Sequence, residues 1–121
     1  MVPIRFKSKE TDAVGYVHPA IFQAISMAAW SVWAQFGAEE LVVTALRDGS
    51  HRVGSRHKQE ICTAVDIRSK GPGAIAKEED RVRAREVLQA TLGSAYKVIL
   101  ENLGEPNEHI HVSYVADGKP A

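Results

Sequence analysis

Cysteine is almost absent from this sequence: Cys62 is the only one among 121 residues. A single cysteine cannot form an internal disulfide, so the fold does not depend on an oxidising compartment. Because unpaired cysteines are among the side chains most often buried, we expect Cys62 to be a small side chain of the core.

A surplus of either charge sign is also absent, since 15 Lys and Arg residues balance 15 Asp and Glu residues. A nucleic-acid-binding domain normally carries excess positive charge to neutralise phosphates. Three arginines lie close together at Arg81, Arg83 and Arg85, but acidic residues surround them, which is typical of a solvated helix face. We therefore expect no nucleic-acid partner.

Long hydrophobic runs are missing as well. The longest apolar stretch, residues 20–36, is interrupted by four polar side chains and is shorter than the ~20 apolar residues that cross a bilayer. No membrane insertion is expected. The first ten residues include basic side chains, but the apolar segment and small-residue cleavage site of a signal peptide do not follow. We expect a protein that is cytoplasmic as synthesised.

The composition that remains is that of an ordinary globular protein, with 45% hydrophobic and 25% charged residues. A chain of 121 residues has room for one hydrophobic core. We therefore expect a single domain over residues 1–121, so that any site must be built around that one core.

Hydrophobic periodicity predicts two helices. Between Pro19 and Gly37 apolar residues recur at steps of three and four, with proline suited to the first turn and glycine to the end. Residues 78–92 form the second pattern, with acidic residues in the first turn and Gly93 after the last. Its expected inward side chains are those of Val82, Val87, Leu88 and Leu92.

Four short segments have the character of strands: 40–46, 63–68, 96–101 and 109–115. The polar segment 47–60 and the glycine-containing segment 69–74 are expected to be loops. This order of elements predicts an α+β fold, in which two or more helices pack on a small, mainly antiparallel sheet.

Side chains suited to metal binding occur on two of these strands. Asp66 lies in the middle of one, and His109 and His111 share a face of the last one. If the two strands are neighbours, these side chains meet, and two imidazoles with one carboxylate complete a catalytic zinc set. A salt bridge from Asp66 to Arg52, Arg56 or Arg68 is the alternative. Polar-apolar alternation on a half-exposed strand also explains the His-Ile-His pattern.

Three motifs occur in a fixed order: Ser55-Arg-His57, Ala64-Val-Asp66 and Glu108-His-Ile-His111. Together they resemble the zinc-binding core of the M15 peptidases, the group of D-Ala-D-Ala carboxypeptidases, dipeptidases and phage endolysins, and are most similar to its short phage-type members. The segment Tyr96-Lys-Val-Ile-Leu-Glu101 before the last motif resembles those members too. The likeness extends over most of residues 20–115 and implies a hedgehog/DD-peptidase-like fold.

The resemblance assigns roles to individual residues. It implies that His57, Asp66 and His111 bind Zn²⁺ and that Glu108 is the general base. Ser55 and Arg52 would lie beside the substrate, which would be a peptidoglycan stem peptide. His109 would be a neighbour of the metal site, or the ligand in place of His111.

The chain departs from the family in the loop before Asp66. Eight residues separate His57 from Asp66, about two more than the family usually has, and an even number of extra residues preserves the facing of a strand side chain. The glycine that the family usually has in this loop is also missing. A loop of different length and composition could rearrange the site, and in that alternative Cys62 or Glu60 would bind the metal.

Two hypotheses of function follow. The first is a zinc-dependent peptidase that hydrolyses peptide bonds of bacterial peptidoglycan, encoded by a phage or prophage and acting on the cell wall after release. The second is a catalytically inactive M15-like domain that binds cell-wall peptide or a protein partner. Trp30 and Trp33 are expected to pack in the core, whereas exposure of both would indicate an interface.

Overall fold

A computed structural model describes residues 1–7, 16–46 and 61–116 of the chain. The segment 47–60, for which a loop is predicted, lies outside the described residues, and so do Arg52, Ser55 and His57 within it.

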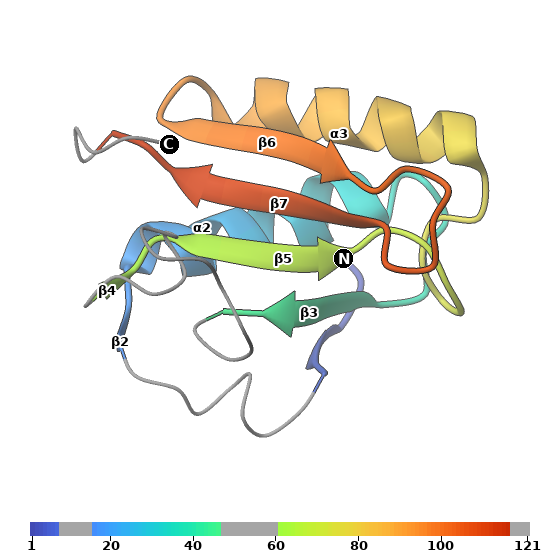
Figure 1. The fold of residues 1–121 in the computed structure, drawn as a ribbon, viewed down its shortest axis with the longest axis horizontal. Coiled ribbons are helices and arrows are strands. Elements are labelled where there is room, and N and C mark those ends of the chain that lie inside the picture. Colours follow the sequence, from blue (N-terminus) through green and yellow to red (C-terminus); the bar gives the residue numbers. More distant parts are fainter. Residues whose placement is uncertain (8–15, 47–60, 117–121) are drawn as a thin grey trace.

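The main sheet has five strands in the order β1-β3-β5-β7-β6 (Figure 1). β1 pairs with β3 in parallel, and the other three pairings are antiparallel. The strands are β1 Ile4–Phe6, β3 Leu41–Ala45, β5 Ala64–Arg68, β6 Tyr96–Glu101 and β7 His109–Tyr114. The predicted α+β fold with a mainly antiparallel sheet is confirmed.

Three short strands were not expected from the sequence. β1 extends the main sheet at one edge, while β2 (Tyr16–Val17) and β4 (Ile61–Cys62) form a separate two-stranded parallel pair. Strands of two or three residues are too short to show an alternating pattern, so only their pairing reveals them.

The first helix, α2, spans Pro19–Met27 and begins where the sequence predicts. The backbone N–H of Ala20 donates a hydrogen bond to Nδ1 of His18 at 3.0 Å, so the imidazole caps the helix. The helix continues as a π-helix, η1, over Ala28–Trp33. It therefore ends earlier than the predicted Gly37, where the chain turns toward β3 with a φ of +76°.

The second helix, α3, spans Glu78–Leu92, as predicted. Its buried side chains are Arg81, Ala84 and Leu88, whereas Val82 is 38% exposed. The expectation that Val82 faces inward is therefore wrong, and so is the interpretation of Arg81 as part of a solvated face. The other predicted inward side chains do face the core, since Leu88 is buried and Val87 and Leu92 are partly buried against it. Arg81 is buried because it has a buried acidic partner, described below.

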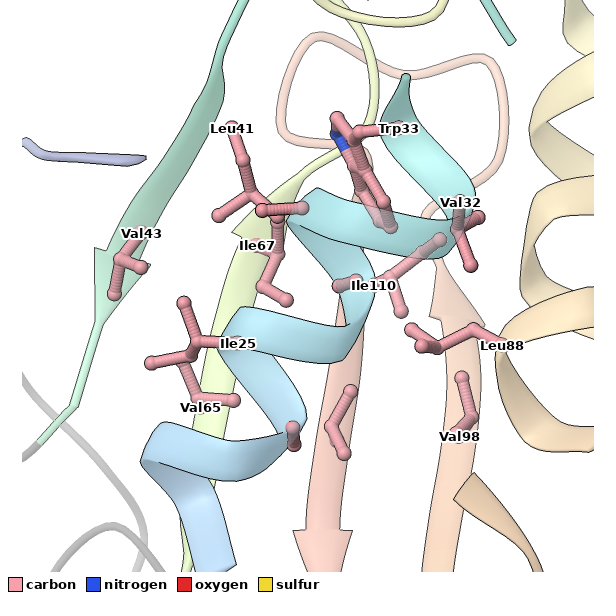
Figure 2. Close-up of a cluster of buried hydrophobic side chains, with 14 of the residues drawn as sticks. Ile25, Val32, Trp33, Leu41, Val43, Val65, Ile67, Leu88, Val98 and Ile110 are labelled. Atoms are coloured by element: carbon pink, nitrogen blue, oxygen red, sulfur yellow. The ribbon is translucent and has the colours of Figure 1, made fainter. Parts of the chain in front are cut away.

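The core lies between these helices and one face of the sheet. Figure 1 shows α2 and α3 behind the strands, and Figure 2 shows the layer of side chains that fills the space between them. Trp33 is fully buried there, together with Ile67 and Ile110 from the two central strands. Trp30, only three residues from Trp33, is 66% exposed, so core packing is confirmed for one tryptophan alone.

Among the described residues, both helices pack on one face of the sheet, and the opposite face is turned to the viewer in Figure 1. We call it the open face; Asp66, His109 and His111 lie on it. In the described parts of the chain, no helix combines the length and apolar character needed to cross a bilayer.

Candidate metal centre

Strand register brings Asp66 and His111 together. β5 and β7 are antiparallel neighbours, and Asp66 is paired directly with His111. Side chains of directly opposed residues project to the same face and lie next to each other. Here Nδ1 of His111 is 2.8 Å from Oδ1 of Asp66, within hydrogen-bond distance.

The side chains of Glu101 and His109 lie next to this pair on the same face of the sheet. Glu101 on β6 is paired with His109 on β7, and Nε2 of His109 lies 3.4 Å from Oε1 of Glu101. The same His109 nitrogen is 3.8 Å from Oδ1 of Asp66, and Nδ1 of His111 is 3.8 Å from Oε1 of Glu101. The four side chains thus form one cluster across three adjacent strands.

Asp66, Glu101 and His111 form a group that could hold a metal ion. One ligand atom from each lies within 4.8 Å of the others. One imidazole nitrogen with two carboxylate oxygens is a donor set that suits Zn²⁺ and similar borderline cations. Asp66, Glu101 and His111 could therefore together hold a metal ion.

Partial burial makes this cluster more than a set of solvated charges. The side chains of Asp66 and His111 are 15% and 21% exposed, whereas Glu101 is 43% exposed. A half-buried carboxylate in the middle of a strand loses much of its hydration and needs a partner. The contact with His111 supplies one such partner, and a bound cation would supply another.

Glu108 lies on the other side of the sheet. Its side chain is fully buried, and Oε2 is 2.7 Å from Nε of Arg81 on α3. The hydroxyl of Ser69 donates to Oε2 at 2.6 Å, and the backbone N–H of Gly104 donates to Oε1 at 3.0 Å. These three contacts tie the start of β7 to α3 and to the turn that precedes it.

The electrostatic surroundings of Glu108 keep it ionised. Burial by itself raises the pKa of this carboxyl group, but the Gly104 and Ser69 hydrogen bonds and the charge of Arg81 outweigh that effect. The net result is a pKa below the ordinary value for glutamate. Glu108 is therefore a stably charged member of a buried ion pair.

Strand geometry explains why Glu108 is separated from His111. Side chains alternate between faces along a strand, so residues three positions apart point to opposite sides. Glu108 comes directly before β7 and follows this alternation, since it, Ile110 and Val112 are all buried on the core side. The general-base role expected for Glu108 does not fit this arrangement.

The predicted site residues thus fall into three groups. The structure brings Asp66 and His111 together, separates Glu108 from them, and does not describe His57, Ser55 or Arg52.

The alternative ligands have different positions. Cys62 is buried, as expected, and its thiol donates to the backbone oxygen of Ala64 at 3.0 Å. Glu60 lies outside the described residues.

Glu101 is the member of the cluster that the sequence analysis missed. The sequence could have indicated Glu101, because two strands joined by a turn, such as β6 and β7, usually pair as an antiparallel hairpin. In that pairing Glu101 lies opposite His109. Aligning the two strands through the turn would have placed this carboxylate on the face that carries both histidines.

Comparison of the chain with protein-family models, with curated proteins and with solved structures finds no match.

Proposed function

We propose that this protein is a zinc-dependent peptidase that hydrolyses peptide bonds of bacterial peptidoglycan stem peptides. The observation that carries the proposal is the Asp66–His111 pair on the open face, with the Glu101 carboxylate close to it. The order of the three sequence motifs supports it, because Asp66 and His111 are motif residues to which the resemblance assigns metal binding.

In this proposal Asp66 and His111 hold the metal, with His57 as the third ligand that the family resemblance implies. When bound, zinc lowers the pKa of a coordinated water and polarises the carbonyl group of the substrate. The protein must also provide a group that accepts the proton of the water and delivers it to the leaving amine.

We assign that proton-accepting role to Glu101 in place of Glu108. The Glu101 carboxylate is on the open face, is partly exposed, and has an oxygen 3.8 Å from Nδ1 of His111. Nε2 of His109 lies 3.4 Å from the same oxygen and orients the carboxylate. Glu108, in contrast, is already engaged by Arg81, Ser69 and Gly104.

The buried pairing of Glu108 favours a second candidate function. A family member that lacks its usual general base would bind peptide without cleaving it. Under this reading the protein is a catalytically inactive M15-like domain that recognises cell-wall peptide or a protein partner. The metal, if bound, would then be structural.

Turnover distinguishes the two candidates. Purified protein is loaded with zinc and incubated with peptidoglycan fragments, and release of amino acids or peptides is followed by mass spectrometry. The peptidase proposal predicts cleavage that Glu101→Gln removes while zinc content is retained. Zinc-loaded, folded protein without any cleavage would contradict the peptidase proposal and leave the binding domain.

The proposal also includes a location. A phage or prophage enzyme of this type would accumulate in the cytoplasm and reach the cell wall after release. Fractionation of a producing cell before and after lysis would show the protein move from the cytoplasmic fraction to the wall fraction. Association with the wall before lysis would contradict this part.

A further inference from the structure

The free edge of the main sheet at β6 is partly covered by side chains of α3. β6 is the outermost strand and lies alongside this helix (Figure 1). Gln89 accepts a hydrogen bond from the N–H of Val98 and donates one to the backbone oxygen of Tyr96. Nε of Arg85 donates to the backbone oxygen of Val98 at 3.0 Å. Edge groups that are not covered in this way stay available to another chain.

Strand alternation identifies Leu100 as a position without such cover. In an antiparallel pair, the N–H and C=O of one residue point to the partner strand, and those of the next residue point away from it. Both groups of Val98 bind side chains of α3, so they point away from β7. Leu100, two positions later in the same pairing, points the same way. Within the described part of the chain, no side chain or turn supplies a hydrogen-bond partner for these two groups of Leu100.

A mainly apolar groove of about 390 Å³ lies alongside this position, between α3 and β6. We call it the edge groove, defined by Val82, Arg85, Glu86, Leu100 and Leu103. Val82 and Leu103 are 38% and 46% exposed, although both side chains are large and apolar. The groove has one cation and one anion, Arg85 and Glu86, and therefore no net charge.

The open backbone groups and the groove together specify the ligand as an extended peptide. An extended residue that runs antiparallel to β6 can bond both groups of Leu100 through its own N–H and C=O. Directly opposed residues project their side chains to the same face. Leu100 shares its face with Val98, which is buried on the side of α3. The side chain of the paired peptide residue therefore lies beside Val82, where apolar walls without net charge suit an aliphatic group.

The length of the open edge favours a peptide segment over a second copy of the chain. Val98, two positions before Leu100, is covered by α3, and Asn102, two positions after it, turns the chain with a φ of +56°. Pairing with the sheet edge of a second copy would need several open positions in a row. A stable protein–protein interface also buries about 1,200 Å² or more, which one paired residue does not approach.

We propose that the edge groove binds an extended segment of a protein partner. The segment makes two backbone hydrogen bonds to Leu100 and places an aliphatic side chain between Val82 and Leu103. Glu101 follows Leu100 in the chain, but its side chain belongs to the metal cluster on the open face, whereas the segment lies beside the edge of the sheet. Binding therefore requires neither metal nor turnover, and the inference is independent of the proposed peptidase function.

Three capped tripeptides test this binding directly. The first, acetyl-alanyl-leucyl-alanine N-methylamide, has both the backbone groups and the aliphatic side chain. The second has N-methyl-leucine at its centre and so lacks the central N–H, and the third has alanine there and lacks the aliphatic side chain. Each is titrated into isotope-labelled protein with EDTA present, so that no probe binds through a metal ion. NMR chemical shifts report the binding position and the dissociation constant.

We expect the first probe to bind with a dissociation constant in the millimolar range and to shift the amide signals of Leu100 and Leu103. The other two probes should bind at least about fivefold more weakly, since one loses a hydrogen bond and the other loses buried apolar area. Val82→Lys should weaken binding of the first probe by a similar factor. Ile4→Lys, the same change at an aliphatic side chain of β1 that is 37% exposed, is the matched control and should leave binding unchanged.

The proposal would be overturned by equal binding of the three probes, by no binding of the first, or by unchanged binding in folded Val82→Lys. If Val82→Lys does not fold, Leu103→Lys takes its place. Shifts centred on β1 would show that any sheet edge binds the probe, and would also overturn the proposal. Shifts of the Leu100 signal on dilution of the protein without peptide would show that a second copy occupies the groove, which excludes the proposed partner.

Discussion

Nδ1 of His111 lies 2.8 Å from Oδ1 of Asp66, although 45 positions separate the two residues in the chain. The contact exists because β5 and β7 pair in the register that places these residues opposite each other. Both side chains are therefore positioned by the central strands of the sheet, whose backbone hydrogen bonds limit their movement. A site on rigid strands is better preorganised than one carried by loops.

Glu108 should prove to be a structural residue. Replacing it with glutamine leaves the buried Arg81 without its charged partner, which we expect to lower the free energy of unfolding by about 3–5 kcal/mol. Urea unfolding followed by circular dichroism measures this change. Glu105→Gln, at an exposed position of the same turn, is the matched control and should change stability by less than about 0.5 kcal/mol.

Substitution of a general base would instead lower activity and leave the free energy of unfolding nearly unchanged. If Glu108 had that role, Glu108→Gln would abolish activity and leave stability near that of the wild type. That pattern would contradict the buried ion pair described here.

Acid should weaken the fold through the same residue. The pKa of Glu108 is lower in the folded chain than its ordinary value of 4.5, so its charged form favours the folded state. This contribution is fully present above pH 4.5 and is lost as the pH falls toward the folded pKa. In unfolding experiments, the stability difference between wild type and Glu108→Gln should therefore shrink below pH 4.5. A difference that stays constant to the acid limit of folding would contradict this assignment.

The two tryptophans should respond very differently to substitution. Trp33 is fully buried in the core, so Trp33→Ala should cost about 3–5 kcal/mol of stability. Trp30 is 66% exposed, and Trp30→Ala should stay within about 0.5 kcal/mol of the wild type. Thermal unfolding of both variants measures the contrast. Similar losses for both would show that Trp30 is covered in solution, for example by a second copy of the chain.

The edge of the sheet at β6 depends on one glutamine of α3. The side-chain amide of Gln89 donates to the backbone oxygens of Gly93 and Tyr96 and accepts from the N–H of Val98. These bonds satisfy edge groups that would otherwise be open to pairing with another strand. Gln89→Ala should lower stability by about 1–3 kcal/mol. Gln23→Ala, at an exposed position of α2, is the control, and equal effects would contradict the capping role.

The sequence predicts the open face well because the face depends on a local rule. Alternation along a strand places Asp66 on one side of β5 and His111 on one side of β7. Only the pairing of the two strands had to be assumed, and the structure supplies it. The same rule also separates Glu108 from His111, since an odd spacing along a strand reverses the face.

The sequence does not reveal the features that depend on tertiary contacts. Arg81 is a charged residue in an acidic helix turn, and nothing local shows that its partner is Glu108, 27 positions later. The change from α-helix to π-helix at Ala28 is equally hidden, because the apolar spacing of the segment is compatible with both. These features arise when α2, α3 and the turn before β7 pack together.

Zinc binding by the open-face cluster is the central claim, and isothermal titration of the metal-free protein tests it most directly. We predict one zinc ion per chain for the wild type, with affinity reduced at least about tenfold in both Asp66→Ala and His111→Ala. Lys97→Ala, a change at an exposed position of the neighbouring strand β6, should leave the affinity unchanged. Folded wild-type protein that binds no zinc, or binds it equally well without Asp66 and His111, would contradict the account.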